Sequence, residues 1–150
     1  SPQLRWLDET LGRTGRRWTI VYFHYPVYSS IRTAPASLPV RLAEMKKHVE
    51  PVLLGHRVDL VLNGHTHSYQ RSRPVARGQV DEKTGIVYVV TGGGGKSADR
   101  IVPAPEPWNA FTREGYHFVL ATVDGDSHTV EAIFLDGARD KFTIYKRPAP

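Results

Sequence analysis

The sequence predicts a mixed α/β (α+β) fold in which a partly parallel sheet is completed by antiparallel hairpins. In the first half, an amphipathic helix leads directly into a β-branched and aromatic strand, and a second helix leads into a short apolar strand. This alternation is typical of parallel strands joined by helical crossovers. In the last third, short strands alternate with Asp-Gly turns, which is the pattern of β-hairpins. A chain of 150 residues has the size of a single domain with one hydrophobic core.

The first half is expected to contain two helices, one strand and a long loop. Leu4, Leu7 and Leu11 recur at helical spacing. Several prolines and serines after the first strand exclude a long regular element there. In the second helix, Pro51 predicts a kink or a restart because proline has no amide hydrogen to donate. We therefore expect a helix over 3–11, a strand over 18–23, a loop over 25–39 and a helix that begins near Val40.

The second half is expected to consist mainly of strands. The short apolar run within 58–63 is typical of a buried parallel strand, and a β-branched run follows at 86–90. Asp124-Gly125 and Asp136-Gly137 supply the turn residues of two hairpins. The segments beside these turns predict strands over 115–122, 129–135 and 142–147.

A glycine run at 92–95, followed by Lys96 and Ser97, ends like a phosphate-binding P-loop. The P-loop pattern needs a glycine at position 90, where this chain has Val90, and it needs a helix next, where the segment 99–108 contains three prolines. Both departures exclude a P-loop. The glycine run instead predicts a close approach of the backbone to a neighbouring segment or a ligand.

Three histidines follow the ends of two predicted strands. His24 closes the first strand, and His65 and His67 come after the second, with one residue between them. Residues two apart in an extended chain project to the same side, and open α/β sheets bind ligands beyond the carboxyl ends of their strands. Imidazole suits zinc, iron, copper and nickel. Each histidine alone fits a hydrogen-bonded residue at a strand end, but their shared position favours a metal site.

The other histidines show no such arrangement. His48 and His56 belong to the second predicted helix and its end, where we expect them to be exposed. His117 and His128 lie in the hairpin region, where we expect them to be structural or exposed.

Composition excludes several classes of function. The net charge is +5 and the isoelectric point about 9.6, but the basic residues are dispersed and no basic stripe with interleaved aromatics predicts nucleic-acid binding. No apolar run approaches the roughly 20 residues that span a bilayer. The absence of cysteine excludes disulfides, thiolate zinc sites, iron–sulfur clusters and cysteine nucleophiles.

Several segments together resemble the C-terminal part of the catalytic domain of calcineurin-like metallophosphoesterases, in the purple acid phosphatase branch. The Gly-His-x-His segment, with a His-x-Pro segment upstream, is the most specific of them. The matching segments are Gln3-Leu-Arg-Trp-Leu-Asp8, His24-Tyr-Pro-Val-Tyr-Ser29, Val58-Asp-Leu-Val-Leu-Asn-Gly-His-Thr-His-Ser-Tyr-Gln-Arg71, Tyr88-Val-Val-Thr-Gly-Gly-Gly94 and Gly115-Tyr-His-Phe118.

This resemblance implies half of a four-layer α/β/β/α sandwich around two metal ions, drawn from iron, zinc and manganese. The complete family site hydrolyses phosphomonoesters by attack of a metal-bound hydroxide. Position by position, His24 and His65 would bind one metal and His67 the other, while Tyr69 and Arg71 would shape the substrate pocket rim. The resemblance also implies a secreted or extracytoplasmic location, which the residues themselves leave open.

The chain departs from the family pattern in its missing carboxylate segments. It has no Gly-Asn-His segment, and its Gly-Asp dipeptide, Gly125-Asp126, lies in a predicted hairpin turn that follows the histidine segments. Gln70 stands where the family often has Glu. We expect the missing segments to lie N-terminal to Ser1, so that residues 1–150 alone hold at most one metal ion and are inactive or strongly impaired as an acid phosphatase-like hydrolase.

A non-catalytic alternative remains open from the sequence. A β-rich fragment of this fold would expose strand edges and apolar surface. It would then serve as an association module, paired with the missing N-terminal half of the domain or with another copy of itself. The phosphoesterase hypothesis instead predicts a phosphate ester substrate, and neither hypothesis involves nucleic acid or a membrane.

Overall fold

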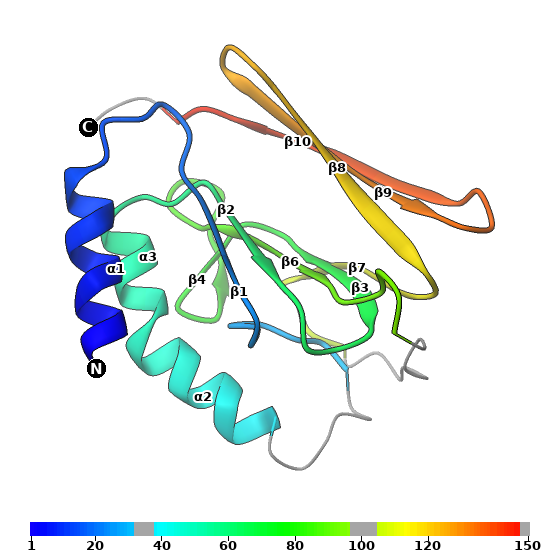
Figure 1. The fold of residues 1–150 in the computed structure, drawn as a ribbon, viewed down its shortest axis with the longest axis horizontal. Coiled ribbons are helices and arrows are strands. Elements are labelled where there is room, and N and C mark those ends of the chain that lie inside the picture. The colour runs from blue at the N-terminus through cyan, green and yellow to red at the C-terminus, as the bar shows by residue number, and fades with distance from the viewer. Residues whose placement is uncertain (32–37, 97–104, 148–150) are drawn as a thin grey trace.

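The computed structural model describes residues 1–31, 38–96 and 105–147. In these residues the chain forms helices, a five-stranded sheet, a three-stranded sheet and a small hairpin (Figure 1). No helix of the described part is long and apolar enough to cross a membrane. The helices are α1 (Pro2–Arg13), α2 (Leu38–His48) and α3 (Glu50–Gly55), and the strands are β1 (Ile20–Phe23), β2 (Leu60–Asn63), β3 (Ser68–Ser72), β4 (Val75–Ala76), β5 (Gln79–Val80), β6 (Val87–Thr91), β7 (Asn109–Glu114), β8 (His117–Asp124), β9 (Ser127–Phe134) and β10 (Arg139–Tyr145).

The five-stranded sheet has the order β1-β2-β6-β3-β7. Strands β1, β2 and β6 are parallel, with Phe23 opposite Asn63 and Asn63 opposite Val90. Strand β3 runs antiparallel to both β6 and β7. The predicted parallel pair and the mixed character of the sheet are therefore confirmed.

The central strands are buried on both faces. On β2, Val61 packs into a cluster with Leu11 of α1 and Leu53 of α3, whereas the neighbouring Leu60 packs toward the three-stranded sheet with Val130. Because successive residues of a strand point to opposite faces, the short apolar run serves two cores. The described residues therefore form three layers: helices, the five-stranded sheet and the three-stranded sheet (Figure 1).

The three-stranded sheet, in the order β10-β9-β8, is the predicted pair of C-terminal hairpins. Gly125 and Gly137 adopt positive φ angles of 53° and 86° in the two Asp-Gly turns, which glycine reaches without steric cost. On β9, alternate residues are buried against the five-stranded sheet. This alternation fixes the strand register, because a slip by one residue would expose the apolar set.

The outer face of the three-stranded sheet is uncovered in the described residues. Phe118 and Leu120 on this face are 56% and 51% exposed. The mixed α+β class is confirmed, but the fourth layer of the expected α/β/β/α sandwich is not among the described elements. The helices of the described residues lie on the opposite side of the five-stranded sheet.

Strands β3 and β7 and the small β4–β5 hairpin were not predicted from the sequence. Strand β3 has the sequence Ser-Tyr-Gln-Arg-Ser and β7 has Asn-Ala-Phe-Thr-Arg-Glu, so neither shows the apolar alternation of a half-buried strand. The predicted restart at Pro51 is confirmed, because α2 ends at His48 and Pro51 lies in the first turn of α3. The expected loop over 25–39 and the proline-containing segment 99–108 fall partly on 32–37 and 97–104, outside the described residues.

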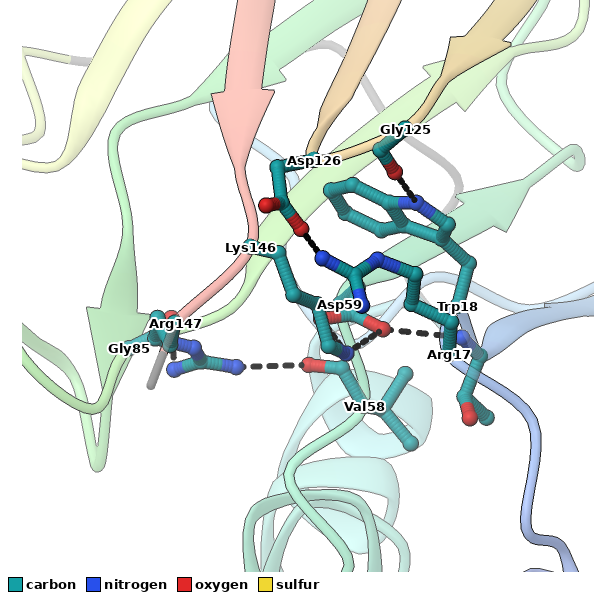
Figure 2. Close-up of polar contacts among 10 residues, drawn as sticks. Arg17, Trp18, Val58, Asp59, Gly85, Gly125, Asp126, Lys146 and Arg147 are labelled. Carbon is teal, nitrogen blue, oxygen red and sulfur yellow. Dashed lines mark hydrogen bonds and ion pairs between the residues drawn. The ribbon is translucent and has the colours of Figure 1, made fainter. Parts of the chain in front are cut away.

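A group of polar contacts joins the two sheets at the end where β1 and β2 begin (Figure 2). Asp59 accepts hydrogen bonds from the Lys146 ammonium at 2.8 Å and from the Thr19 amide at 2.8 Å. The Trp18 indole donates to the Gly125 carbonyl at 3.0 Å. The group also includes an Arg17–Asp126 ion pair. In addition, the Arg147 guanidinium donates to the Val58 and Gly85 carbonyls. These contacts lie at the opposite end of the strands from the predicted histidine site.

Candidate metal site

The parallel pairing of β1 and β2 brings His24 and His65 into contact. The strands end in register at Phe23 and Asn63, and the Gly64 amide donates to the His24 carbonyl at 3.0 Å. His24 directly follows Phe23, and His65 follows Asn63 with Gly64 between them. His65 Nδ1 lies 3.2 Å from His24 Nε2, and the ring centroids are 5.1 Å apart. Thus the strand ends place two of the three predicted ligands side by side.

The Asn63 side chain connects the end of β2 to the end of β1 by hydrogen bonds. It is 3% exposed, and its Nδ2 donates to the Phe23 carbonyl at 3.0 Å and to the Tyr25 carbonyl at 3.5 Å. The Asn63 Oδ1 is a buried oxygen with no hydrogen-bond partner among the described residues. The backbone on both sides of His24 is therefore held by a side chain of the neighbouring strand.

His65 has a left-handed backbone, with φ of 69°. This conformation costs of order 1 kcal/mol for a residue other than glycine and persists where the surroundings enforce it. Here His65 is the central residue of a tight turn, because the Thr66 amide donates to the Gly64 carbonyl, and a second tight turn follows in which the Ser68 amide donates to the Thr66 carbonyl. The strained residue is one of the two that meet at the strand ends.

An aromatic ring and a cation border the histidine pair. The Tyr25 ring lies 4.6 Å from the His65 ring and 5.0 Å from the His24 ring. The Arg41 guanidinium of α2 lies 4.8 Å from the centre of the Tyr25 ring. Sequence reasoning missed both neighbours, and Arg41, in particular, carries no motif that would have revealed it.

The distance between the two ring nitrogens fits a shared metal ion. Two imidazole nitrogens bound at about 2.0–2.1 Å to one tetrahedral zinc ion lie roughly 3.3 Å apart, close to the 3.2 Å between His24 Nε2 and His65 Nδ1. The same distance fits a hydrogen bond from a protonated nitrogen of one ring to the bare nitrogen of the other. In the part of the chain that the structure describes, no group of three or more His, Cys, Asp or Glu side chains could hold a metal ion.

His67 is half-buried and lies beside the glycine run. A Cβ atom on Gly92 would overlap the Thr66 backbone and lie 3.4 Å from the His67 Cα. A Cβ atom on Gly93 would overlap the His117 ring. The prediction that the glycine run allows close backbone approach is therefore confirmed. Metal binding by His24, His65 and His67 stays a prediction.

Tyr69 and Arg71 contact Asp140 of the three-stranded sheet. The Tyr69 hydroxyl donates to Asp140 Oδ2 at 2.8 Å, and Arg71 donates from Nε to Oδ2 at 2.7 Å and from Nη2 to Oδ1 at 3.0 Å. Tyr69 is fully buried, and burial followed by the Asp140 carboxylate raises the pKa of its hydroxyl. The predicted role of these residues at a pocket rim stays a prediction, and both have a partner within the chain.

The other histidines differ in their exposure. His48 is exposed as expected and pairs with Glu44 at 3.4 Å, whereas His56, also expected to be exposed, is half-buried and pairs with Asp8 at 2.6 Å. His117 is 4% exposed and its ring contacts the Gly115 carbonyl and the Thr91 hydroxyl. His128 is fully buried, and neither ring nitrogen has a hydrogen-bond partner among the described residues. Burial lowers the pKa of both His117 and His128.

Comparisons with known proteins place this arrangement in a family context. The family model described as calcineurin-like phosphoesterase matches residues 1–69. Purple acid phosphatase 18 of Arabidopsis thaliana is 34% identical over 122 residues, which make up 77% of this chain and 27% of that protein. This chain thus spans about a quarter of the length of that curated relative.

Two solved structures share the fold. A purple acid phosphatase from yellow lupin (Lupinus luteus) seeds superposes with a TM-score of 0.83 at 23% identity, covering 98% of this chain and 28% of that one. GAP50, the anchor in the inner membrane complex of Plasmodium, superposes with a TM-score of 0.66 at 14% identity, covering 95% of this chain and 42% of that one.

Proposed function

Because this chain belongs to the calcineurin-like phosphoesterase family and has purple acid phosphatases among its relatives, we propose that it supplies histidine ligands to the metal centre of a phosphomonoesterase. The observation that carries the proposal is the contact of His24 Nε2 with His65 Nδ1 at 3.2 Å. The contact lies beyond the carboxyl ends of two parallel strands, where α/β sheets hold their ligands.

His24 and His65 share one metal ion in this proposal, and His67 serves a second ion of the complete site. A bound zinc, iron or manganese ion acts as a Lewis acid toward phosphate and lowers the pKa of bound water. The chain's own contribution is to hold two imidazoles at a spacing that one ion can bridge. The backbone strain at His65 supports this role, because strained residues persist where the fold enforces them, often at functional sites.

The chain alone lacks a complete ligand set within its described residues. Two imidazoles leave a tetrahedral ion with two positions open to water or to ligands from elsewhere. We therefore expect weak binding of at most one ion per chain and little or no hydrolysis of an aryl phosphate such as p-nitrophenyl phosphate. A phosphate ester is the substrate of the complete site in this proposal.

Calorimetric titration of the 150-residue chain with Zn²⁺ tests the proposal. One ion is expected to bind per chain, and His65→Ala is expected to weaken binding at least roughly tenfold because a direct ligand is lost. His48→Ala is the matched control, since it removes an exposed histidine that pairs with Glu44 outside the site. Equal affinities for wild type and His65→Ala, or a larger loss in His48→Ala, would overturn the assignment.

A second candidate function is association without catalysis. Strand β1 is an edge strand of the five-stranded sheet, and its Tyr22 is 82% exposed. Beside it, an apolar groove of about 800 Å³ lies between α1 and β1, with Leu4, Trp6 and Leu7 in its lining. Unpaired strand edges and apolar surface favour pairing with another chain. GAP50, an anchor protein, has the same fold.

Sedimentation over a range of concentrations tests this second candidate. Association through β1 is expected to produce a concentration-dependent dimer that Tyr22→Lys abolishes, because an edge lysine opposes strand pairing. A wild-type chain that stays monomeric across the range would remove the association hypothesis and leave the zinc result unaffected.

A further inference from the structure

Gln70 of β3 is a buried amide with polar partners on both of the segments that carry the histidines. Its side chain is 3% exposed. Sequence reasoning identified it only as a departure from the family pattern. The partners divide into two groups, one for each end of the amide.

The oxygen of the amide holds the segment that follows His24. Gln70 Oε1 accepts a hydrogen bond from the Ser30 amide at 2.7 Å and from the Ser29 hydroxyl at 3.1 Å, and the Ser30 hydroxyl lies at 3.4 Å. Between His24 and Ser29, the chain is firmly packed, because Val27 is 0% exposed and Tyr28 is 2% exposed. A displacement at Ser29 is therefore transmitted toward His24.

The nitrogen of the amide holds the turn between His65 and His67. Gln70 Nε2 donates to the Thr66 hydroxyl at 3.0 Å and to the Ser68 hydroxyl at 3.1 Å. Thr66 is 2% exposed and directly follows the strained His65. A single side chain thus connects the two segments whose histidine rings meet.

The network is anchored at its far side by β7. The Ser30 hydroxyl shares a 2.9 Å hydrogen bond with the Thr112 hydroxyl, which in turn donates to Asn109 Oδ1 at 2.9 Å. Because each bond is made between buried or half-buried groups, the loss of one leaves a polar group unsatisfied away from water. The network therefore has one well-defined arrangement.

We propose that Gln70 is a positioning residue for the His24–His65 metal pair. This inference rests on the proposed function. An amide suits the task because it presents an acceptor to the Ser30 N–H group and two donors to the Thr66 and Ser68 hydroxyls. The groups that orient metal ligands commonly contribute a factor of 10–100 in metal affinity.

The test compares three variants by Zn²⁺ titration of the 150-residue chain. Gln70→Leu removes every hydrogen bond of the Gln70 amide at nearly constant volume and is expected to weaken zinc affinity roughly tenfold. Thr66→Val removes a single bond and is expected to weaken it by a smaller factor. Ser72→Ala is the matched control on the same strand, because its buried hydroxyl accepts a hydrogen bond from the Tyr88 amide, away from the histidines. Its affinity is expected to stay within about twofold of wild type.

Ring ¹⁵N chemical shifts of the metal-free protein provide a second readout, independent of metal binding. Gln70→Leu and Thr66→Val are expected to shift the His24 and His65 ring nitrogens, whereas Ser72→Ala leaves them unchanged. If Gln70→Leu does not fold, Thr66→Val carries both measurements. Wild-type zinc affinity in the folded variants, ring shifts that stay unchanged in them, or equal losses in Ser72→Ala would each overturn the positioning role.

The two readouts separate this inference from the proposed function. If the wild-type chain binds no zinc, the proposed function fails, and the ring shifts alone decide whether Gln70 orders the pair. If the wild-type chain binds zinc and Gln70→Leu binds it equally well, the positioning role fails and the proposed function stands.

Discussion

Removal of the Asp140 carboxylate should destabilise the contact between the two sheets. Asp140 is 8% exposed, and it is the hydrogen-bond acceptor of both Tyr69 and Arg71. In Asp140→Ala, the Arg71 guanidinium, whose side chain is 19% exposed, loses two hydrogen bonds and its counter-charge. The fully buried Tyr69 hydroxyl loses its acceptor.

The magnitude follows from the cost of each unpaired group. Removing one partner of a buried ion pair costs about 3–5 kcal/mol, and an unsatisfied buried hydroxyl costs about 1–3 kcal/mol. The partial exposure of Arg71 allows water to replace some of the lost contact, so we expect the free energy of unfolding to fall by about 3 kcal/mol. The triple variant Tyr69→Phe, Arg71→Met, Asp140→Leu leaves no polar group unpaired and should lose less than Asp140→Ala.

Urea unfolding followed by tryptophan fluorescence measures both variants. Asp136→Ala is the matched control, because Asp136 pairs with Arg113 but its side chain is 61% exposed, and an exposed ion pair contributes about 0–1 kcal/mol. The reasoning is refuted if Asp140→Ala loses no more stability than Asp136→Ala, or if the triple variant loses as much as Asp140→Ala.

Two further predictions concern acid sensitivity and the glycine run. Burial lowers the pKa of His117 and His128, so the unfolded state binds more protons once the pH falls below the ordinary histidine value of about 6.5. The free energy of unfolding should therefore be highest above that pH and decrease below it, by up to about 1.4 kcal/mol per pH unit for each histidine, until the folded-state pKa is reached. His128→Phe should flatten this slope in urea titrations between pH 7.5 and 5.5, and an unchanged slope would show that His128 does not contribute. Gly92→Ala should destabilise the protein by about 1–3 kcal/mol because its Cβ overlaps the Thr66 backbone. Gly94→Ala, where a Cβ meets nothing within 4 Å, should stay within about 0.5 kcal/mol of wild type; thermal unfolding compares the two, and equal melting temperatures would contradict the close approach.

The elements that could be predicted from the sequence are those whose side chains repeat a pattern. The apolar run of β2 and the aromatic run of β1 identified two parallel strands, and that pairing places His24 beside His65. The Asp-Gly turns identified both C-terminal hairpins, because glycine at a positive φ is a local requirement. In these places, local chemistry and the overall fold agree.

The remainder depends on partners that are distant in the sequence. Tyr69 and Arg71 lie 71 and 69 residues from Asp140, and nothing near either residue identifies that carboxylate. Strand β3 is polar because its side chains serve these contacts and the Gln70 network, so it shows no apolar period. For the same reason, Arg41 was recognised as a neighbour of the histidine pair only from its contact with the Tyr25 ring.

The most direct test of the shared metal site is anomalous X-ray scattering at the zinc edge from crystals of this chain grown with Zn²⁺. We expect a peak about 2.0–2.1 Å from both His24 Nε2 and His65 Nδ1. The absence of an anomalous peak between these nitrogens, with zinc peaks only at His48 or His56, would contradict the shared metal site.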